Sequence, residues 1–446
     1  MQVRALAFLS ILFLGCSSKP EKLDVVLIAV DTLRRDHVGV YNPQSPAKTP
    51  NMDALAADGV RFTDAFSPVS VTGPAFVSMM TGQEPGQHGV LTNLFRGGEP
   101  LSDSVETVAE RFEDAGYSTG AFVSAFTLRS ALGLRRGFDV YNGGEQSNRV
   151  GAATASVLGS WLAVQEGHVF LWAHLFDAHG PLHRWLEPGD SEIEWERDRT
   201  RLRHFPKYQR IDDITDARLY QRLYVRGVEY ADKQVGVIIA QLKELGRYDD
   251  ALIVLMADHG EGFEERELWY DHGTSAHAEQ TQIPLLIKWP KSQQAGKTDA
   301  RLASIMDIAP TTLDVAKLAA LPKATGKSLL KAGEGHSLLY AESSHCKRVP
   351  VLDCWPVGGS GKELAVRDST MALVSKTSQR GTENQLYDRT KDAKELSALQ
   401  ASASTDLSAA LTGFQTDRRL RKYGPLPNAR PTNADEEKLK QLGYLE

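Results

Sequence analysis

The fold is decided by the stretch ALIVLMADHG, residues Ala251–Gly260, in which seven apolar residues run directly into Asp258 and His259. A second apolar run, Val25–Val30, ends in the same way at Asp31. Short runs that are apolar throughout are typical of parallel strands whose two faces are both buried. In such sheets ligands bind at the carboxyl ends of the strands, where the following helices begin. The sequence therefore predicts that two carboxylates and an imidazole assemble from distant segments into a metal site.

Strand-like runs alternate with helical patterns from residue 23 to residue 330. This alternation predicts an α/β catalytic domain with a mostly parallel sheet flanked by helices. Residues 331–446 contain further short β-type runs, which predict a small C-terminal antiparallel α+β subdomain. The expected strands are 25–30, 121–123, 169–172, 252–256, 285–287, 338–342, 363–367, 371–376 and 385–387, and the expected helices are 51–58, 104–115, 149–165 and 219–245.

The first segment, residues 1–16, differs in kind from the rest of the chain. Arg4 precedes the apolar stretch Ala5–Leu14, which is too short to span a bilayer and ends just before Cys16. This order resembles a bacterial lipoprotein signal, in which Cys16 becomes the lipidated N-terminus. We expect an exported, membrane-anchored lipoprotein that faces the periplasm and has the lipid bilayer as a partner. An ordinary secretion signal or an uncleaved anchor is the alternative.

The composition is that of an ordinary globular protein, with 446 residues, 41% hydrophobic, 24% charged and a net charge of −6. A nucleic-acid partner is not expected, because neutralising phosphates requires a basic face. The stretch 190–213 is dense in charge and predicts a solvated surface insertion. Cys346 and Cys354 are expected to form a disulfide in the oxidising compartment that export implies.

A nucleophile is expected at Thr72, whose hydroxyl becomes reactive when a base or a metal removes its proton. Thr72-Gly73-Pro74 precedes an apolar helical pattern over 75–80, so Thr72 is placed at a helix N-terminus, where an oxyanion is favoured. Alone, the pattern is that of a plain helix N-cap. Together with Asp31, Asp258 and His259 it predicts an oxygen and nitrogen shell for one or two divalent cations, which suits zinc or manganese better than calcium.

Motifs spread along nearly the whole mature chain resemble those of the sulfatase family of the alkaline phosphatase superfamily. They are VDTLR at 30–34, TPNMDALA at 49–56, GVRF at 59–62, DHGE at 258–261, HG at 272–273, IPLL at 283–286, GKSLL at 326–330, LYD at 386–388 and LGY at 442–444. By this resemblance the protein is a metal-dependent ester hydrolase with an alkaline-phosphatase-like fold.

The resemblance also implies roles for individual residues. The implied roles are Asp31, Thr72, Asp258 and His259 as metal ligands, Thr72, His179 and His272 as catalytic residues, and Asp177 and His277 as contacts to a second metal or to the substrate. In this scheme Thr72 attacks the ester in line while His179 and His272 hold the ester oxygens. His174 and His183 are expected to be packing or surface residues.

The nucleophile segment departs from the pattern of the family. Sulfatases carry Cys or Ser there, followed by Pro and Arg, and oxidise it to an aldehyde whose hydrate attacks sulfur. This chain has Thr72, and Phe76 stands in place of the arginine. Oxidation of threonine gives a ketone, so formylglycine chemistry is not expected. The lysine and histidine that the family places after Gly116-Tyr117 are also absent, and Thr32 replaces an aspartate.

These departures favour phosphorus over sulfur as the atom attacked. Threonine nucleophiles in the superfamily belong to phosphodiesterases, phosphatases and related transferases, whose transferred group a metal stabilises. The leading hypothesis is a phosphodiesterase or phosphatase acting on a small-molecule or envelope ester. Two alternatives stay open: a sulfuric ester hydrolase (sulfatase) without formylglycine, and a non-catalytic metal-binding lipoprotein.

Overall fold

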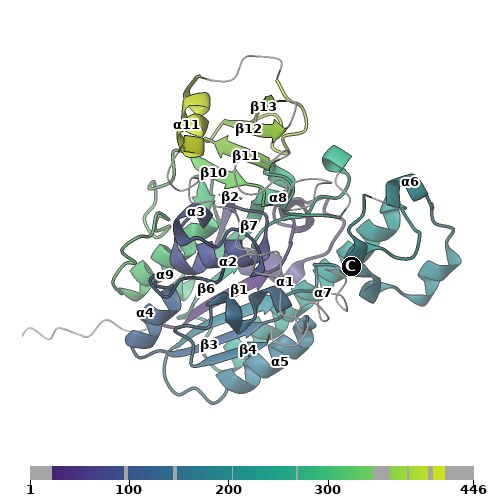
Figure 1. The fold of residues 1–446 in the computed structure, drawn as a ribbon. Helices are drawn as coiled ribbons and strands as arrows, with labels where there is room; N and C mark the ends of the chain where they lie inside the picture. The colour runs from purple at the N-terminus through teal and green to yellow at the C-terminus, as the bar shows by residue number, and fades with distance from the viewer. Residues whose placement is uncertain are drawn as a thin grey trace, which may run out of the picture.

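The computed structural model describes residues 23–94, 99–143, 148–202, 204–267, 270–344, 362–378, 381–399 and 405–416. These residues form a large sheet flanked by helices and a small second sheet with a helix against it (Figure 1). The predicted α/β class, with a mostly parallel sheet and a small antiparallel C-terminal sheet, is therefore confirmed.

The large sheet has nine strands within the described residues, in the order β4-β3-β5-β1-β6-β7-β2-β8, with β9 also paired to β2. Neighbouring strands run parallel except at β7, which is antiparallel to both β6 and β2. The strands are β1 Val25–Val30, β2 Val60–Phe66, β3 Ser118–Val123, β4 Val140–Gly143, β5 Val169–Leu175, β6 Leu252–Met256, β7 Gln282–Lys288, β8 Lys297–Asp299 and β9 Ala303–Ser304.

The helices fall into two groups whose members contact one another, α1 and α5 with α7, and α2 and α4 with α9. The longest is α7, whose buried side chains recur at three-to-four spacing and whose first turn is capped by Asp216. The helices are α1 Pro50–Ala57, α2 Thr72–Thr81, α3 Pro85–His88, α4 Val108–Asp114, α5 Gly151–Leu162, α6 Arg199–Leu202, α7 Ala217–Glu244, α8 Ala278–Thr281 and α9 Ile308–Ala316.

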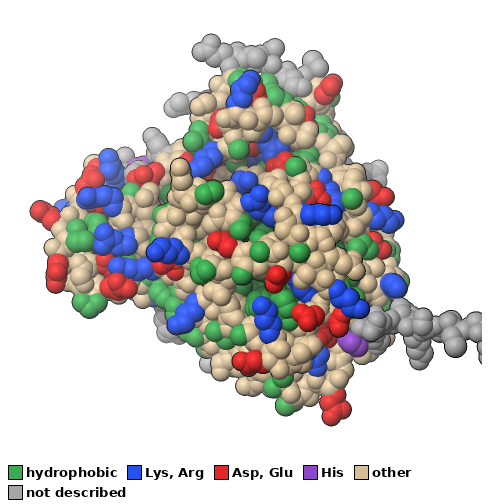
Figure 2. All heavy atoms as spheres, turned by 180° about the vertical axis from the view of Figure 1, so that it is seen from behind, with side chains coloured by type: hydrophobic (Ala, Val, Ile, Leu, Met, Phe, Trp, Pro, Cys, Tyr) green, Lys and Arg blue, Asp and Glu red, His purple; other side chains and the backbone are tan. Residues whose placement is uncertain are grey.

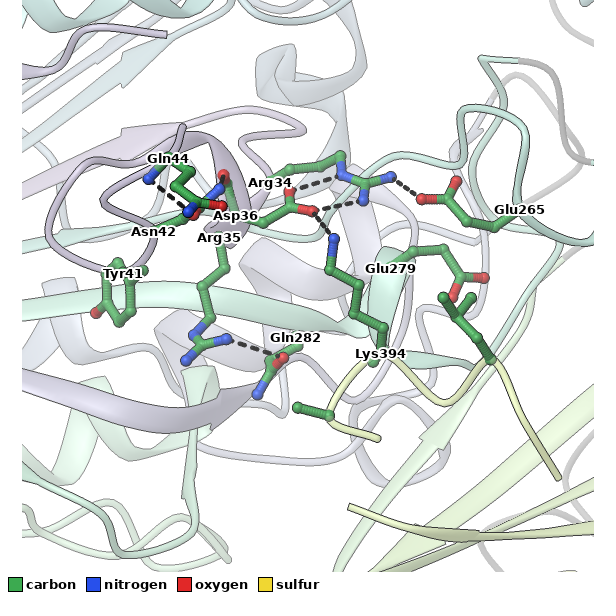
Figure 3. A pocket seen from close by; sticks show the side chains of 13 residues that line it. Arg34, Arg35, Asp36, Tyr41, Asn42, Gln44, Glu265, Glu279, Gln282 and Lys394 are labelled. Carbon is green, nitrogen blue, oxygen red and sulfur yellow. Dashed lines mark hydrogen bonds and ion pairs between the residues drawn. The ribbon is translucent and has the colours of Figure 1, made fainter. Parts of the chain in front are cut away.

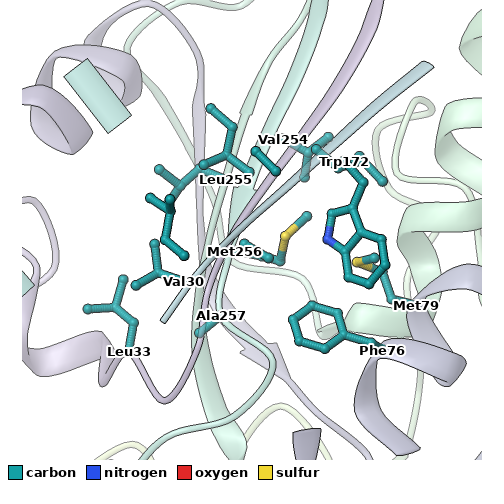
Figure 4. Packing of buried hydrophobic residues seen from close by; sticks show 14 of the residues in the cluster. Val30, Leu33, Phe76, Met79, Trp172, Val254, Leu255, Met256 and Ala257 are labelled. Atoms are coloured by element: carbon teal, nitrogen blue, oxygen red, sulfur yellow. The ribbon is translucent and has the colours of Figure 1, made fainter. Parts of the chain in front are cut away.

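Strand β1 lies between β5 and β6, and all six of its side chains are fully buried, so both of its faces are covered. Branched apolar residues suit this position because their stiff side chains pack well on a pleated surface. Figure 4 shows the packing beside the ends of β1 and β6, where Phe76 and Met79 of α2 lie next to Trp172 of β5. This packing fixes the residues that follow the two strands.

The small sheet is fully antiparallel, in the order β10-β11-β12-β13. Helix α11 packs against β11 and β12, and its Leu407 and Leu411 share a core with Leu373 and Leu386. The elements are β10 Leu339–Glu342, β11 Lys362–Arg367, β12 Met371–Ser378, β13 Gly381–Asp388 and α11 Thr405–Thr416. A bridge between Val69 and Glu342 joins this sheet to the segment that leads into α2.

The prediction of a solvated surface insertion at 190–213 is confirmed for most of its charged side chains, which are exposed, but not for the whole stretch. Trp195 and Phe205 from this stretch are buried in the main core. Asp190 is also buried, and it accepts hydrogen bonds at 3.3 Å from Arg222 and Arg226 of α7. The density of charge hid these apolar residues, and the buried Asp190 ties the segment to partly exposed arginines of α7.

Four strands of the large sheet were not predicted: β2, β4, and the strands β8 and β9, which are too short to show a strand pattern. β2 has mixed polarity and a register shift between Phe62 and Ala65, so its sequence lacks a regular strand period. β4 is a short edge strand whose residues are only partly buried. Neither therefore shows the continuous apolar run that marks β1 and β6.

Several predictions fall on residues outside the described ranges. These are the lipidated Cys16, the Cys346–Cys354 disulfide and the motif at 442–444. Among the described residues, no helix combines the length and the apolar character needed to cross a membrane. The face turned away in Figure 1 mixes basic and acidic side chains over its described surface (Figure 2).

Candidate active site and metal centre

Asp31 and Asp258 lie side by side at the carboxyl ends of the two adjacent parallel strands β1 and β6. The Asp31 N–H continues the sheet by donating to the Leu175 carbonyl at 2.9 Å. Ligand atoms of Asp31, Asp258 and His259 all lie within 4.8 Å of one another, and all three residues are fully buried. The structure thus brings together the three residues that the strand pattern predicted to meet.

The hydrogen bonding of these carboxylates is incomplete. Asp258 Oδ1 accepts from the backbone N–H groups of Thr32 (3.0 Å) and His259 (2.9 Å). The opposite oxygen, Asp258 Oδ2, and Asp31 Oδ1 are buried without a hydrogen-bond partner. Burial, followed by repulsion from Asp258, raises the pKa of Asp31 well above its ordinary value. Because unpaired buried carboxylate oxygens are costly, the donor set fits a divalent cation.

His259 is held in the tautomer that a metal ligand needs. Its Nδ1–H donates to the Gly260 carbonyl at 2.8 Å, which leaves the Nε2 lone pair available. That Nε2 lies 3.3 Å from Asp258 Oδ2 and 3.4 Å from Thr72 Oγ1. A main-chain carbonyl behind the ring therefore orients the imidazole toward the carboxylates.

Thr72 is the first residue of α2, and the N-cap position belongs to Val71, so the threonine hydroxyl does not cap the helix. Its contact is with His259 instead. The amides of the first turn are mostly used: Gly73 N–H donates to Asn93 Oδ1 at 2.9 Å, Pro74 has none, and Ala75 N–H donates to the Val71 carbonyl at 3.0 Å. The expectation that helix amides hold an oxyanion is therefore not met beyond the Thr72 N–H itself.

Phe76 occupies the position at which sulfatases carry arginine, and it is fully buried. Its ring lies 5.2 Å from the ring of Trp172 and meets His174 edge-on at 5.0 Å (Figure 4). Apolar aromatic packing thus stands beside the helix that begins with Thr72, at the position where sulfatases carry a cation.

His174 has a larger role than the expected packing or surface residue. Its Nδ1 accepts a hydrogen bond from Ser124 N–H at 3.2 Å, so its Nε2 carries the proton and donates to Asp31 Oδ2 at 3.2 Å. Both side chains are fully buried. His174 therefore holds Asp31 in place while the other oxygen of that carboxylate stays open. One signal was available in the sequence, because His174 is a lone polar residue in an apolar run.

A row of aromatic rings leads away from the carboxylates. The ring centroids of His259 and His272 are 4.7 Å apart, those of His272 and His179 are 5.0 Å apart, and Tyr208 follows at 5.8 Å from His179. Tyr208 comes from the insertion that was expected to be solvated. Sequence reasoning missed it, because no local pattern shows that this segment folds back over His179.

The two outer histidines of the row are held by different partners. The His179 Nδ1–H donates to the Gly180 carbonyl at 2.5 Å, which leaves Nε2 as a lone pair. Burial, and then the nearby His272, lower the pKa of His179 well below its ordinary value, so the ring is neutral at pH 7. His272 Nδ1 lies 3.3 Å from Glu261 Oε2, and burial raises the pKa of Glu261 to about 8. A cation beside Asp258 would oppose that rise.

The insertion closes tightly against the segment that carries His179. Gln209 is buried, and a Cβ placed on Gly180 would lie 2.1 Å from its Oε1. A larger residue at position 180 would require the Gln209 side chain to move. The insertion is therefore part of the wall of the site.

The structure does not bring Asp177 and His277 into the carboxylate group. Asp177 Oδ1 accepts from Gly151 N–H, the first amide of α5, at 3.0 Å. His277 is held by Glu363 Oε2 at 3.1 Å and by the Tyr387 hydroxyl at 3.2 Å. Asp177 thus caps a helix, and His277 joins the large sheet region to the small sheet.

The fold and the site together define a hydrolase of the alkaline phosphatase superfamily. The Sulfatase family model matches residues 24–318, and the model for the C-terminal region of N-sulphoglucosamine sulphohydrolase matches residues 265–414. The chain therefore belongs to the sulfatase family, whose enzymes use divalent metal ions and hydrolyse sulfate or phosphonate esters.

Individual relatives are distant. An uncharacterized sulfatase of Escherichia coli strain K12, YidJ, is 23% identical over 437 residues, covering 83% of this chain and 82% of its own. An arylsulfatase of Klebsiella aerogenes is 24% identical over 412 residues, covering 67% of this chain and 88% of its own. The phosphonate monoester hydrolase of Agrobacterium radiobacter shares the fold with a TM-score of 0.69 at 22% identity, over 88% of this chain and 94% of the other.

Proposed function

We propose that the protein is a metal-dependent phosphodiesterase or phosphatase in which Thr72 is the nucleophile. The observation that carries the proposal is the contact of Thr72 Oγ1 with His259 Nε2 at 3.4 Å, beside two buried carboxylate oxygens that lack partners. The hydroxyl caps no helix and is directed at the donor set. In the same helix, Phe76 stands where sulfatases carry the arginine that accompanies their oxidised nucleophile.

Asp31, Asp258 and His259, with Thr72 beside them, would hold the cation, which when bound lowers the proton affinity of the hydroxyl and neutralises charge on the ester. The Thr72 hydroxyl loses its proton to solvent, and its oxygen bonds to phosphorus as the bond from phosphorus to the alcohol oxygen breaks. The departing oxygen takes up a proton. Water then cleaves the bond between phosphorus and the Thr72 oxygen, which releases phosphate from a monoester or a phosphate monoester from a diester and restores the hydroxyl.

We assign His179 a proton-accepting role in this scheme, which requires the negative charge of a bound ester to raise the lowered pKa of its ring. In the neutral ring the Nε2 atom carries a lone pair and no proton. It can therefore accept a proton but cannot donate a hydrogen bond to an ester oxygen. It steadies a negative oxygen only after it has taken up that proton. Its role is therefore proton exchange with the alcohol or water, which refines the expected static contact.

A second candidate function is hydrolysis of sulfuric esters by Thr72 without formylglycine. The match to the Sulfatase family model over residues 24–318 and the likeness to an arylsulfatase favour it. The likeness of the fold to a phosphonate monoester hydrolase shows that the same scaffold accommodates a phosphorus centre.

The test is a set of rates on one chromogenic alcohol. The 4-nitrophenyl phosphate, bis(4-nitrophenyl) phosphate, 4-nitrophenyl phenylphosphonate and 4-nitrophenyl sulfate esters are compared with protein loaded with zinc, manganese or calcium. We expect a phosphate ester to be fastest and the Thr72→Ala variant to be inactive. A preference for sulfate would replace the proposal with the second candidate, and metal binding without turnover of any ester would indicate the non-catalytic alternative.

We also propose that the protein is exported and anchored through a lipidated Cys16. The proposal rests on the order of Arg4, the apolar stretch Ala5–Leu14 and the cysteine. Expression of the full chain with labelled palmitate should yield a labelled membrane-bound protein, and a Cys16→Ala variant should lose the label. Mass spectrometry that finds an unmodified Cys16 in the mature protein would contradict the proposal.

A further inference from the structure

A separate pocket of about 380 Å³ lies between the 3-10 helix η1 (Arg35–His37), helix α8 and the segment 393–396 (Figure 3). This volume falls in the range of small-molecule sites. None of the three predicted metal ligands, nor Thr72, His179 or His272, is among its lining residues. The pocket is therefore distinct from the catalytic group.

Most of the charges that line the pocket neutralise one another. The ion pairs are Arg34 with Asp36 at 2.9 Å and with Glu265 at 2.9 Å, Lys394 with Asp36 at 3.1 Å, and Glu279 with Arg266 at 2.5 Å. The three lining carboxylates thus each have a cationic partner, and Asp36 has two.

Arg35 is the exception. Among the described residues it has no ion pair, and its only hydrogen bond is a long one, 3.4 Å from Nη1 to Gln282 Oε1. Its Nε is buried without a partner, and its guanidinium lies over the Tyr41 ring at 5.0 Å. The closest acids are already engaged, Asp36 by Arg34 and Asp64 by Arg389. Arg35 therefore supplies one uncompensated positive charge with open N–H groups.

We propose that this pocket binds a small ligand bearing a carboxylate, with Arg35 as its anchor. The planar fork of a guanidinium matches a carboxylate in two parallel hydrogen bonds. A single uncompensated charge suits a monoanion, because a dianion would be repelled by the acids that line the same pocket. Ala278, Ala393 and the half-exposed Leu396 offer apolar contact to a short hydrocarbon part of the ligand. The proposal does not depend on the reaction at Thr72.

The test is calorimetric titration of the metal-loaded full chain with butyrate, and with neutral butyramide as the matched probe. We expect butyrate to bind with a Kd of about 1 mM or a few-fold weaker, and butyramide to bind about tenfold more weakly. An Arg35→Gln variant should weaken butyrate binding about tenfold, and Arg35→Lys should lie between. The matched control is Arg61→Gln, because Arg61 also lies over the Tyr41 ring, at 5.8 Å, but does not line the pocket.

Thr72→Ala distinguishes this pocket from the catalytic group and should bind butyrate as the unaltered protein does. Equal binding of butyrate and butyramide would overturn the proposal, as would unchanged binding by Arg35→Gln or loss of binding in Thr72→Ala. Should Arg35→Gln fail to fold, unchanged affinity in Arg35→Lys would have the same force. Sulfate or phosphate that binds more tightly than butyrate and depends on Arg35 would overturn the choice of a carboxylate.

Discussion

The two halves of the proposed active site are built in different ways. The metal half consists of Asp31, Asp258 and His259, which follow buried strands directly and are oriented by main-chain atoms beside them. The proposed substrate half consists of His179 and His272, which lie on loops, and Tyr208, which lies in the short 3-10 helix Lys207–Gln209; their rings pack in a row. Rigid strand ends thus fix the donor set, whereas long-range packing fixes the groups that face the substrate.

This difference explains what each half contributes. Metal affinity and nucleophile activation require side chains held closely in place, which strand ends supply. Selection of the ester requires walls that can differ between relatives, which loops supply. We therefore expect substitutions in the metal half to abolish turnover and substitutions in the substrate half to change affinity for particular esters.

The largest effect is expected from Thr72→Ala, which alters the metal half. We expect kcat to fall on the order of 10⁴-fold or more, since the nucleophile is lost. Thr72→Ser should keep activity because it keeps the hydroxyl. The matched control is Thr81→Ala in the same helix, whose hydroxyl donates to the Val77 carbonyl at 2.7 Å and accepts from Gln83 N–H at 3.3 Å. Steady-state kinetics on the preferred ester check this, and full turnover by Thr72→Ala would end the proposed mechanism.

A second substitution removes the hydrogen bond that orients Asp31 but keeps Asp31 itself. His174→Phe should weaken metal binding about 10- to 100-fold, because Asp31 loses the hydrogen bond that orients it. His88→Phe is the control, since His88 is also buried and bonded at both ring nitrogens, to Ser78 and Val90. Competition with a chelating dye measures the affinities. Equal losses in both variants would show general damage and no specific role for His174.

A third test concerns Asp177, the residue that the resemblance placed near the substrate. Burial raises the pKa of Asp177 to about 6, whereas the unfolded chain releases this proton near pH 4. The unfolded state therefore binds fewer protons between these values, so stability falls as pH rises from 4 to 6. Between pH 4 and pH 7 the free energy of unfolding of the unaltered protein falls because of this group. In the Asp177→Asn variant that fall should be smaller by about 2 kcal/mol.

Urea unfolding at both pH values measures that difference. The Asn variant should bind metal normally, because its carbonyl still accepts from Gly151 N–H at the start of α5. Loss of metal in Asp177→Asn would restore the idea of a second metal site there.

The smallest effect is expected from a substitution in the substrate half, which tests whether Tyr208 contacts the ester. Tyr208→Ala should raise KM for aryl esters about fivefold with little change in kcat, because the ring that stacks beside His179 is lost. Tyr208→Phe should behave like the unaltered protein. The same variants assayed on a methyl phosphate ester should show no difference, and an equal rise in KM there would contradict an aromatic contact.

The sequence predicts the metal half well because the necessary information is local. A buried strand leaves its next residue at the sheet edge, so Asp31 and Asp258 could be paired without knowledge of the contacts between them. Tyr208 could not be predicted in the same way. Its position depends on Gln209 fitting against a glycine and on Asp190 pairing with arginines of α7, and neither contact leaves a periodic trace.

The helix N-terminus shows a further limit. The sequence placed Thr72 there correctly, but it could not show that Asn93 occupies the Gly73 amide or that His174 supports a ligand. Both are single hydrogen bonds between residues distant in sequence. Such bonds decide chemistry without changing the composition of any segment.

The position of Phe76 has a consequence for attempts to engineer this enzyme. Exchanging Thr72 for cysteine and Phe76 for arginine would rewrite the local motif, yet the new guanidinium would face Trp172 and the edge of His174. A charge buried among aromatic rings is costly, so we expect the double substitution to destabilise the protein unless Trp172 is made smaller and polar as well. Converting one type of nucleophile into the other thus requires substitutions in the hydrophobic core as well as at residue 72.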